Sequence, residues 1–281
     1  MTSEPREDLR TPDGIILSTA TWEPDSPKAV VLLSHGHAEH IGRYAHVIEA
    51  LTGHGYAVVG QDHRGHGRSG GERALAMRFD DYIDDFRLLA DRTRERHPDL
   101  PRIVLGHSMG GLIAARYTLA WQQDVSALVI CGAAFIIDEG VPAWQSTLVR
   151  VVSKVWPKAP VPRDDSDTLS TDPSVREAFH NDPLTYHGKT RMRTAVEMHD
   201  AGADALARAS TLTVPLLAMH GAIDQLTSPR GTGQFFAAAS STDKSLKLWP
   251  GMKHEIFNEI DRATVIATML DWLDDRFPAT P

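Results

Sequence analysis

The chain has a single cysteine, Cys131, among its 281 residues, which excludes an internal disulfide and a zinc site built from cysteines. No apolar run reaches the roughly 18 residues of a membrane-spanning helix. Residues 1–12 lack the apolar centre of a signal peptide, so we expect a cytoplasmic protein. Positive charge is also scarce. The balance of 29 Lys and Arg against 37 Asp and Glu, a net charge of −8, offers no electrostatic footprint for a nucleic-acid backbone.

The composition that remains is that of an ordinary globular protein, with 42% hydrophobic and 23% charged residues. Short, continuous apolar runs alternate with longer helical patterns. Continuous runs are typical of strands buried on both faces, so the pattern predicts an α/β fold with a mostly parallel central sheet and helices on both faces. The predicted strands are 30–33, 56–59, 103–105, 127–130, 216–219 and 246–249, and the predicted helices are 43–54, 79–97, 109–121, 229–239 and 259–276.

Residues 133–213 interrupt this alternation. They contain several prolines and no strongly apolar strand, which indicates short helices and loops inserted late in the sheet. We therefore expect a core of residues 1–132 and 214–281, with residues 133–213 as a helical cap. A helical subdomain with only a structural role fits the same pattern.

One stretch of this insertion, Val141 to Trp156, carries an apolar stripe at helical spacing. The stripe consists of Val141, Trp144, Leu148, Val151, Val152 and Val155. The segment from Val141 to Arg163 has no acidic residue, and its basic residues are Arg150, Lys154, Lys158 and Arg163. An apolar face with tryptophan and nearby basic residues is typical of a helix that contacts lipid at a membrane surface. The alternative is that the stripe packs on the core.

A nucleophile motif follows the third predicted strand. Gly106-His107-Ser108-Met109-Gly110 fits G-x-S-x-G, and a helical pattern begins directly after it. Strand, tight turn and helix form the context of a nucleophile elbow, in which small residues flank an exposed serine at a helix N-terminus. This predicts Ser108 as the nucleophile.

A serine of ordinary pKa needs a base that a third group orients. In this fold the chain order is serine, acid, histidine. Asp224 follows the fifth predicted strand and His254 the sixth, at the carboxyl ends where ligands bind an open sheet. We expect a triad of Ser108, Asp224 and His254, with Asp138 as the alternative acid. His220 lies too close to its strand for the role of base and is expected to be a packing or hydrogen-bonded residue.

An oxyanion hole needs two backbone N–H groups. One is expected from Met109, directly after the nucleophile. The other is expected from His37, in the loop Ser34 to His40 after the first predicted strand.

Taken together, these residues resemble the monoacylglycerol lipase family of serine α/β-hydrolases, close to bacterial monoglyceride lipases and lysophospholipase-like esterases, over about residues 13–275. Gly106 to Gly111 is identical to the family's GHSMGG elbow, and Asp62 to Gly71 resembles its DHxGHGxSxG segment. Leu169 to Pro173 and Asn181 to Leu184 match two cap segments. The resemblance implies the α/β-hydrolase fold, the triad given above, no cofactor and no metal.

The chain departs from the family after the first strand. The family usually has HGxGEH, and this chain has His35-Gly36-His37-Ala38-Glu39-His40. His37 and Ala38 stand at small positions beside the expected oxyanion hole, which bears on substrate preference more than on mechanism.

Two further patterns suggest other chemistry. His35-x-His37-x-Glu39-His40 resembles the HxHxDH zinc motif of metallo-β-lactamase-fold hydrolases, but it lacks the aspartate and leaves the serine elbow unexplained. Gly65-x-Gly67-x-x-Gly70 fits a dinucleotide fingerprint, but no helical pattern begins until about Phe79. Neither is our preferred interpretation.

The resemblance and the apolar stripe favour hydrolysis of a lipid ester, monoacylglycerol above others, through an acyl-serine intermediate. The cap would then make peripheral contact with a membrane. A short-chain carboxylesterase or lysophospholipase with the same triad, and a non-catalytic ligand-binding member of the fold, are the alternatives.

Overall fold

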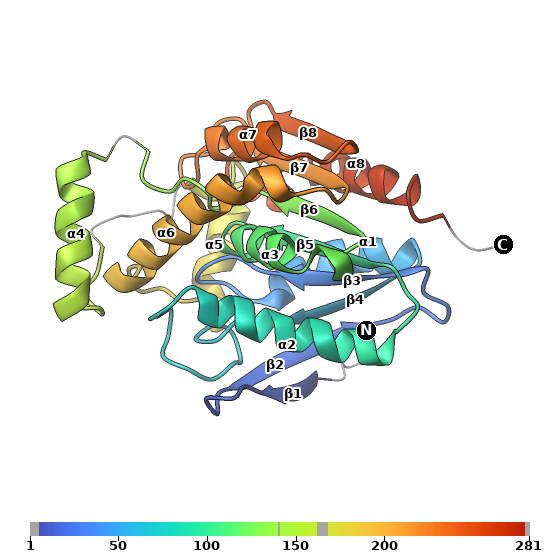
Figure 1. Cartoon of the computed structure of the whole chain (residues 1–281), viewed down its shortest axis with the longest axis horizontal. Coiled ribbons are helices and arrows are strands. Elements are labelled where there is room, and N and C mark those ends of the chain that lie inside the picture. The colour runs from blue at the N-terminus through green and yellow to red at the C-terminus, as the bar shows by residue number, and fades with distance from the viewer. Residues whose placement is uncertain (1–5, 140, 162–167, 279–281) are drawn as a thin grey trace.

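The computed structural model describes residues 6–139, 141–161 and 168–278 (Figure 1). One eight-stranded sheet forms its centre, in the order β1-β2-β4-β3-β5-β6-β7-β8. Strands β3 to β8 run parallel, while β1 and β2 pair antiparallel at one edge. This confirms the α/β fold with a mostly parallel sheet. The strands are β1 (Arg6–Arg10), β2 (Ile16–Trp22), β3 (Ala29–Ser34), β4 (Tyr56–Gln61), β5 (Arg102–His107), β6 (Ala127–Cys131), β7 (Leu216–Gly221) and β8 (Lys244–Trp249).

Helices cover both faces of the sheet. Strand β3 sends Val30 and Leu32 to a core cluster with α2, α3 and α7, and Val31 and Leu33 to a second cluster with α1 and α8. A strand buried on both faces needs apolar side chains at every position, which explains its continuous apolar run. These helices are α1 (Ala45–Gly53), α2 (Asp80–Arg96), α3 (Met109–Ala120), α7 (Pro229–Ala238) and α8 (Arg262–Asp274).

Two strands were absent from the prediction. β1 carries charged side chains at most positions, and β2 is rich in serine and threonine. Both belong to the antiparallel edge, where β1 is only partly buried and pairs on one side alone. An edge strand of this kind does not need the apolar run that identified the six inner strands.

The segment between β6 and β7 forms α4 (Ala143–Val155), α5 (Pro173–Asn181) and α6 (Met192–Arg208). Its described residues contain no strand, as expected, and pair only through an isolated bridge between Pro160 and Arg191. Helix α6 packs on α3 and places Ala201 and Ala205 in the core cluster that contains Val30 and Leu32. Helix α4 stands farther from the sheet and contacts α6 (Figure 1).

Most of the apolar stripe faces away from the protein, and only Val152 is half-buried. Val155 is 84% exposed, Trp144 66% and Val151 58%. The opposite side of the helix is the one that packs, because Ser153 is buried and Arg150 forms an ion pair with Asp200 of α6. The alternative that the stripe packs on the core is therefore wrong. Of the basic residues predicted nearby, Arg163 lies outside the described residues.

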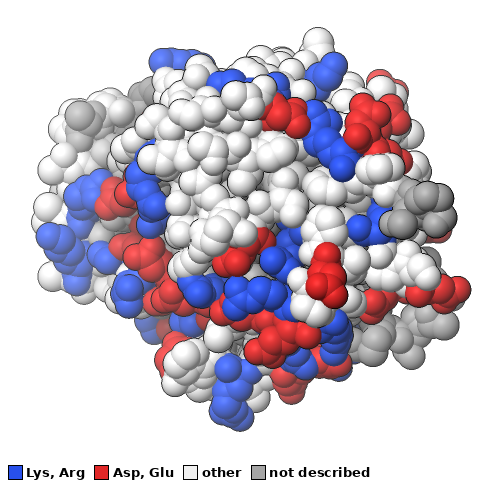
Figure 2. All heavy atoms as spheres, turned by 45° about the vertical axis from the view of Figure 1, so that its right-hand side comes forward, with Lys and Arg blue, Asp and Glu red and all other residues white. Residues whose placement is uncertain are grey.

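Charge is mixed elsewhere on the surface. On the face in Figure 2, Lys and Arg side chains lie beside Asp and Glu rather than in one patch of a single sign. Ion pairs between α2 and β1 contribute to this pattern, with Arg92 and Arg96 both pairing with Glu7. None of the helices in the described ranges is long and apolar enough to cross a membrane.

Candidate active site

Ser108 lies in a strained turn between β5 and α3. Its backbone has φ 56° and ψ −121°, a region that side-chain-bearing residues rarely adopt. Its N–H donates to the carbonyl of Cys131 at 2.9 Å, and its own carbonyl accepts from Ala134 N at 3.0 Å. The serine is thus held at the carboxyl end of the sheet, directly before Met109, the first residue of α3.

The two glycines of the motif are required by close backbone contacts. A Cβ on Gly106 would lie 2.1 Å from the carbonyl oxygen of Gly110, and a Cβ on Gly110 would lie 2.1 Å from that of Ser34. Both distances are far inside van der Waals contact. The elbow therefore folds only because these positions lack side chains.

Asp224 and His254 lie together on neighbouring loops, as expected from the sequence. His254 Nδ1 donates to Asp224 Oδ2 at 2.7 Å, and both side chains are almost completely buried. The same carboxylate accepts from the backbone N–H of Leu226 at 2.8 Å and of Thr227 at 3.1 Å. These bonds fix the carboxylate against the imidazole.

His220, at the end of β7, is hydrogen-bonded as expected rather than free to act as a base. Its Nε2 lies 2.9 Å from Asp224 Oδ2, and its Nδ1 lies 2.7 Å from Thr232 Oγ1. Asp138, the alternative acid, pairs instead with His199 of α6 at 3.3 Å. The structure therefore brings Asp224, and not Asp138, to His254.

The pKa values of the pair move apart. Burial alone would raise the pKa of Asp224, but His254 and His220 hold it well below its usual range. Burial alone would lower the pKa of His254, but the Asp224 carboxylate raises it above the ordinary histidine value. Asp224 is thus an anion that stabilises the protonated imidazole, which is what a base needs once it has taken a proton.

The loop after β3, residues 35–40, lies beside the elbow. The Cβ position of Gly36 is 3.2 Å from Cβ of Ser108. Ala38 has φ 65°, the left-handed conformation that explains why the family usually has glycine there. The ring nitrogens of His37 are buried without hydrogen-bond partners, and burial lowers the pKa of His37 to about 3. His37 is therefore neutral at physiological pH.

The zinc interpretation lacks a converging set of ligands. His35 Nε2 accepts from the backbone N–H of His63 at 2.9 Å, and His40 Nε2 pairs with Asp182 at 2.8 Å. Within the three described stretches of the chain, no group of three or more His, Cys, Asp or Glu is placed to hold a metal ion. The glycine-rich segment 65–70 is a loop, and α2 begins only at Asp80.

The motif segments outside the triad support the β3 loop. Asp62 accepts from the backbone N–H of Ile41 at 2.9 Å. From the insertion, the backbone N–H of Tyr186 donates to the carbonyl of Ala38 at 2.8 Å, and Asp182 binds His40. Asp62 and residues 182–186 thus hold residues 38–41 in place.

The segment 169–173 is attached to the loop that carries His254. Glu259 is 1% exposed, and its Oε1 accepts from the backbone N–H of Lys253 at 2.7 Å. Its other oxygen accepts from Ser170 Oγ at 3.1 Å and from the backbone N–H and hydroxyl of Thr171. No local sequence pattern identifies Glu259, because its partners are up to 89 residues away in the chain.

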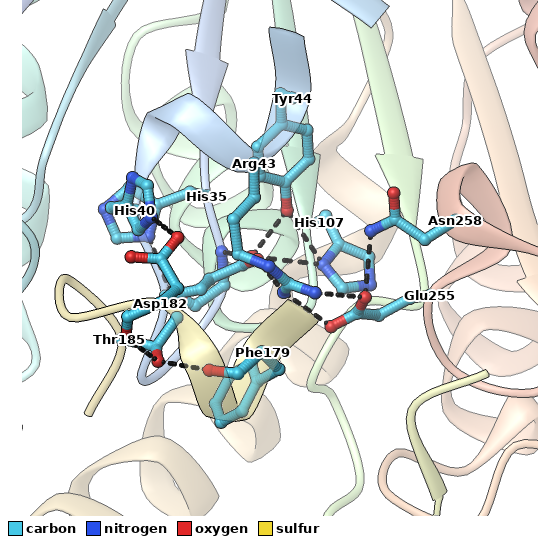
Figure 3. Close-up of polar contacts among 12 residues, drawn as sticks. His35, His40, Arg43, Tyr44, His107, Phe179, Asp182, Thr185, Glu255 and Asn258 are labelled. Atoms are coloured by element: carbon cyan, nitrogen blue, oxygen red, sulfur yellow. Dashed lines mark hydrogen bonds and ion pairs between the residues drawn. The ribbon is translucent and has the colours of Figure 1, made fainter. Parts of the chain in front are cut away.

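A cluster of buried charged residues was also missed (Figure 3). Arg43 lies between Glu39 of the β3 loop and Glu255, the residue after His254. Glu39 and Arg43 are four residues apart in the sequence, a weak signal of pairing. The pairing with Glu255 spans 212 residues and leaves no local signal.

Comparison with known proteins identifies the family of this chain. A family model described as "Serine aminopeptidase, S33" matches residues 25–261. The chain is 39% identical to the monoacylglycerol lipase of Mycolicibacterium smegmatis over 261 residues, which is 92% of this chain and 93% of that protein.

Solved structures give the same result. The fold is similar to that of the Paleococcus ferrophilus monoacylglycerol lipase, with a TM-score of 0.84 and 26% identity, covering 92% of this chain and 99% of that one. A Saccharomyces cerevisiae monoglyceride lipase variant, at 23% identity, shares the fold with a TM-score of 0.89 over 100% of this chain and 97% of that one. The chain belongs to the monoacylglycerol lipase family of serine α/β-hydrolases.

Proposed function

We propose that this protein hydrolyses monoacylglycerol to glycerol and a fatty acid, with Ser108 as nucleophile, His254 as base and Asp224 as the acid that orients it. One observation carries the proposal, the 2.7 Å bond from His254 Nδ1 to the buried Asp224, and the strained backbone of Ser108 in its elbow supports it. The names of the relatives support a lipid ester as substrate over a general short-chain ester.

The first half-reaction acylates the serine. As Ser108 Oγ bonds to the ester carbonyl carbon, its proton passes to His254 Nε2 and the carbonyl electrons move onto oxygen. Asp224 stabilises the imidazolium that forms. When the carbonyl reforms, the bond to the glycerol oxygen breaks, and that oxygen takes the proton from His254. Glycerol leaves, and the acyl group remains on Ser108.

The second half-reaction uses water in place of the alcohol. Water gives a proton to His254 as its oxygen bonds to the acyl carbon. The second tetrahedral intermediate collapses with cleavage of the bond to Ser108 Oγ, which takes back the proton. The fatty acid leaves, and the free enzyme is restored.

The oxyanion of both intermediates would accept hydrogen bonds from the backbone N–H groups of His37 and Met109. Two features support this assignment. Met109 is the first residue of the twelve-residue helix α3, whose N-terminus favours negative charge. His37 follows Gly36, which lies against the Ser108 side chain. Preorganised donors of this kind are each worth about 3–4 kcal/mol in the transition state.

We further propose that residues 133–213 act as a cap and that α4 contacts a lipid surface. Soluble proteins rarely leave a contiguous apolar face of this kind on the surface without a binding role. Here four large side chains of the stripe, Trp144, Leu148, Val151 and Val155, are each more than half exposed. The helix holds its polar side on α6, so the apolar side is free to meet a membrane that carries the substrate.

Initial rates on 1-monoolein and on a soluble butyrate ester test the function. The wild type is expected to prefer monoolein, and Ser108→Ala to lose almost all turnover on both esters while remaining folded. A strong preference for the butyrate ester would be consistent with the triad but would contradict monoacylglycerol as the substrate. Wild-type rates in a folded Ser108→Ala protein would reject the mechanism.

A further inference from the structure

One guanidinium joins two buried carboxylates from different loops (Figure 3). Arg43 Nη1 lies 2.6 Å from Glu39 Oε2 and 2.7 Å from Glu255 Oε1, and its Nη2 lies 2.8 Å from Glu255 Oε2. The Arg43 side chain is 9% exposed, and each carboxylate is 4% exposed. Ion pairs this deep are screened little by salt, so their charges act strongly on neighbouring groups.

Glu39 extends this link into the β3 loop. Its Oε1 accepts from the backbone N–H of Gly36 at 2.5 Å and from the hydroxyl of Tyr44 at 2.6 Å. Gly36 directly precedes His37, whose N–H is the proposed oxyanion donor. The carboxylate therefore fixes the peptide chain at the point where that donor is presented.

Glu255 extends the link into the loop that carries His254, residues 250–258. It directly follows His254, and Asn258 Nδ2 donates to its Oε2 at 2.8 Å. His107, directly before Ser108, connects the elbow to both loops. Its Nε2 lies 3.2 Å from the carbonyl of His254, and its Nδ1 lies 3.0 Å from the hydroxyl of Tyr44, which donates to Glu39. Elbow, β3 loop and base-carrying loop are thus joined in one buried network.

We propose that Arg43 and Glu255 are positioning residues for the hydrolysis. Arg43 holds the loop of the base at a fixed place relative to the β3 loop, and the charge of Glu255 raises the pH above which His254 can accept the serine proton. The inference rests on the proposed function, because it takes His254 as the base.

The sign of the effect follows from the charges around the His254 ring. An anion nearby favours the imidazolium, so Glu255 and Glu39 act with Asp224 to raise the pKa of His254 against the effect of burial. Arg43 opposes them. The groups that act on the ring or contact it are Asp224, Glu255, Glu39 and His107. The further titratable and charged groups, which are linked to these or to the loop of His254, are His220, Cys131, Arg43, Lys253 and Glu259.

The first test is the pH dependence of kcat/KM for Glu255→Gln. The amide keeps the size of the side chain and removes its charge, which also leaves the cation on Arg43 less neutralised. Both changes disfavour the imidazolium, so the acid limb should move down by about half a pH unit or more. An acid limb that stays at the wild-type pH in the folded variant would overturn the role of Glu255.

Arg43→Lys distinguishes the positioning of the His254 loop from the effect of charge on His254. It is also the second variant to measure if Glu255→Gln fails to fold. Lysine keeps the cation but cannot make the forked contact with Glu255. The acid limb should then stay near its wild-type pH, while kcat at the plateau falls by about tenfold with little change in KM. A wild-type kcat in this variant would overturn the positioning role.

Asp85→Asn is the matched control. Asp85 is a buried carboxylate on α2 that pairs with Arg64 at 2.6 Å, outside the network described above. This change should reduce stability and leave the acid limb in place, and an equal shift here would mean that the effect is not local to His254.

Ser108→Ala in the same series keeps the two proposals distinguishable. If Ser108→Ala keeps its activity, the mechanism itself is rejected. If Ser108→Ala is inactive but the acid limb of Glu255→Gln stays at the wild-type pH, only this inference is rejected.

Discussion

Asp224 and His254 are joined through a carboxylate oxygen that also serves a second histidine. Oδ2 accepts from His254 Nδ1 at 2.7 Å and lies 2.9 Å from His220 Nε2. His220 in turn lies 2.7 Å from Thr232 Oγ1 at its other nitrogen. Other partners thus hold the carboxylate that faces His254, and its position does not depend on His254 alone.

This arrangement makes Asp224→Asn the sharpest test of the acid. The amide would lose the charge that stabilises the His254 imidazolium, so we expect kcat to fall by a factor on the order of 10³–10⁴ with the fold intact. Asp138→Asn is the control, because Asp138 pairs with His199 on α6. It should leave kcat within about twofold. A large loss in Asp138→Asn, with activity kept in Asp224→Asn, would reverse the assignment.

The elbow gives a prediction on stability. In Gly110→Ala the new Cβ would meet the carbonyl oxygen of Ser34 at 2.1 Å, so we expect a loss of at least about 3 kcal/mol or failure to fold. Gly233→Ala is the matched control, because nothing lies within 4 Å of its Cβ position in α7. Alanine there should stabilise by about 0.5–1 kcal/mol. Chemical denaturation of both variants measures the contrast, and equal stabilities would contradict the packing of the elbow.

Ala38 carries strain that glycine would relieve. Its φ of 65° costs alanine about 1–2 kcal/mol, against the roughly 0.5–1 kcal/mol of extra chain entropy that glycine loses on folding. Ala38→Gly should therefore keep or slightly raise the melting temperature. Ala203→Gly, at an exposed position inside α6, should lower stability by about 1 kcal/mol. A clear loss of stability in Ala38→Gly would show that the loop does not need this backbone conformation.

The exposed stripe of α4 gives a prediction on lipid binding. The double variant Trp144→Ser with Val155→Ser removes two of its most exposed apolar side chains. We expect several-fold weaker binding to lipid vesicles, a higher KM on monoolein in vesicles and an unchanged rate on a soluble ester. Ile260→Ser is the control, because Ile260 is 70% exposed but lies just before α8. Equal loss of binding in both would mean that α4 is not the contact surface.

The inner part of the fold could be predicted because its strands are apolar at every position. Strand β3, with Val30 to Leu33 divided between two core clusters, shows why such runs identify a sheet covered on both sides. Strand β1 could not be found in this way. Four of its five residues are charged, and one of them, Glu7, pairs with Arg92 and Arg96 of α2 instead of entering the core.

The candidate site residues could be predicted because they belong to short local motifs. The glycines around Ser108 and the loop positions of Asp224 and His254 follow from the geometry of a single turn or strand end. The bridge from Arg43 to Glu255 depends on two loops meeting in space, and no short pattern encodes it. The direction of the α4 stripe could not be predicted from the sequence either, because it depends on contacts with α6, such as the ion pair of Arg150 with Asp200, and on the burial of Ser153.

The central claim is that Ser108 forms the covalent bond to the acyl group. Treatment with a serine-reactive fluorophosphonate, followed by peptide mass mapping, tests it directly. We expect one adduct, on the peptide that contains Ser108, which is absent in Ser108→Ala and forms much more slowly in His254→Ala. An adduct on another residue, or labelling of folded Ser108→Ala at the wild-type rate, would contradict the account.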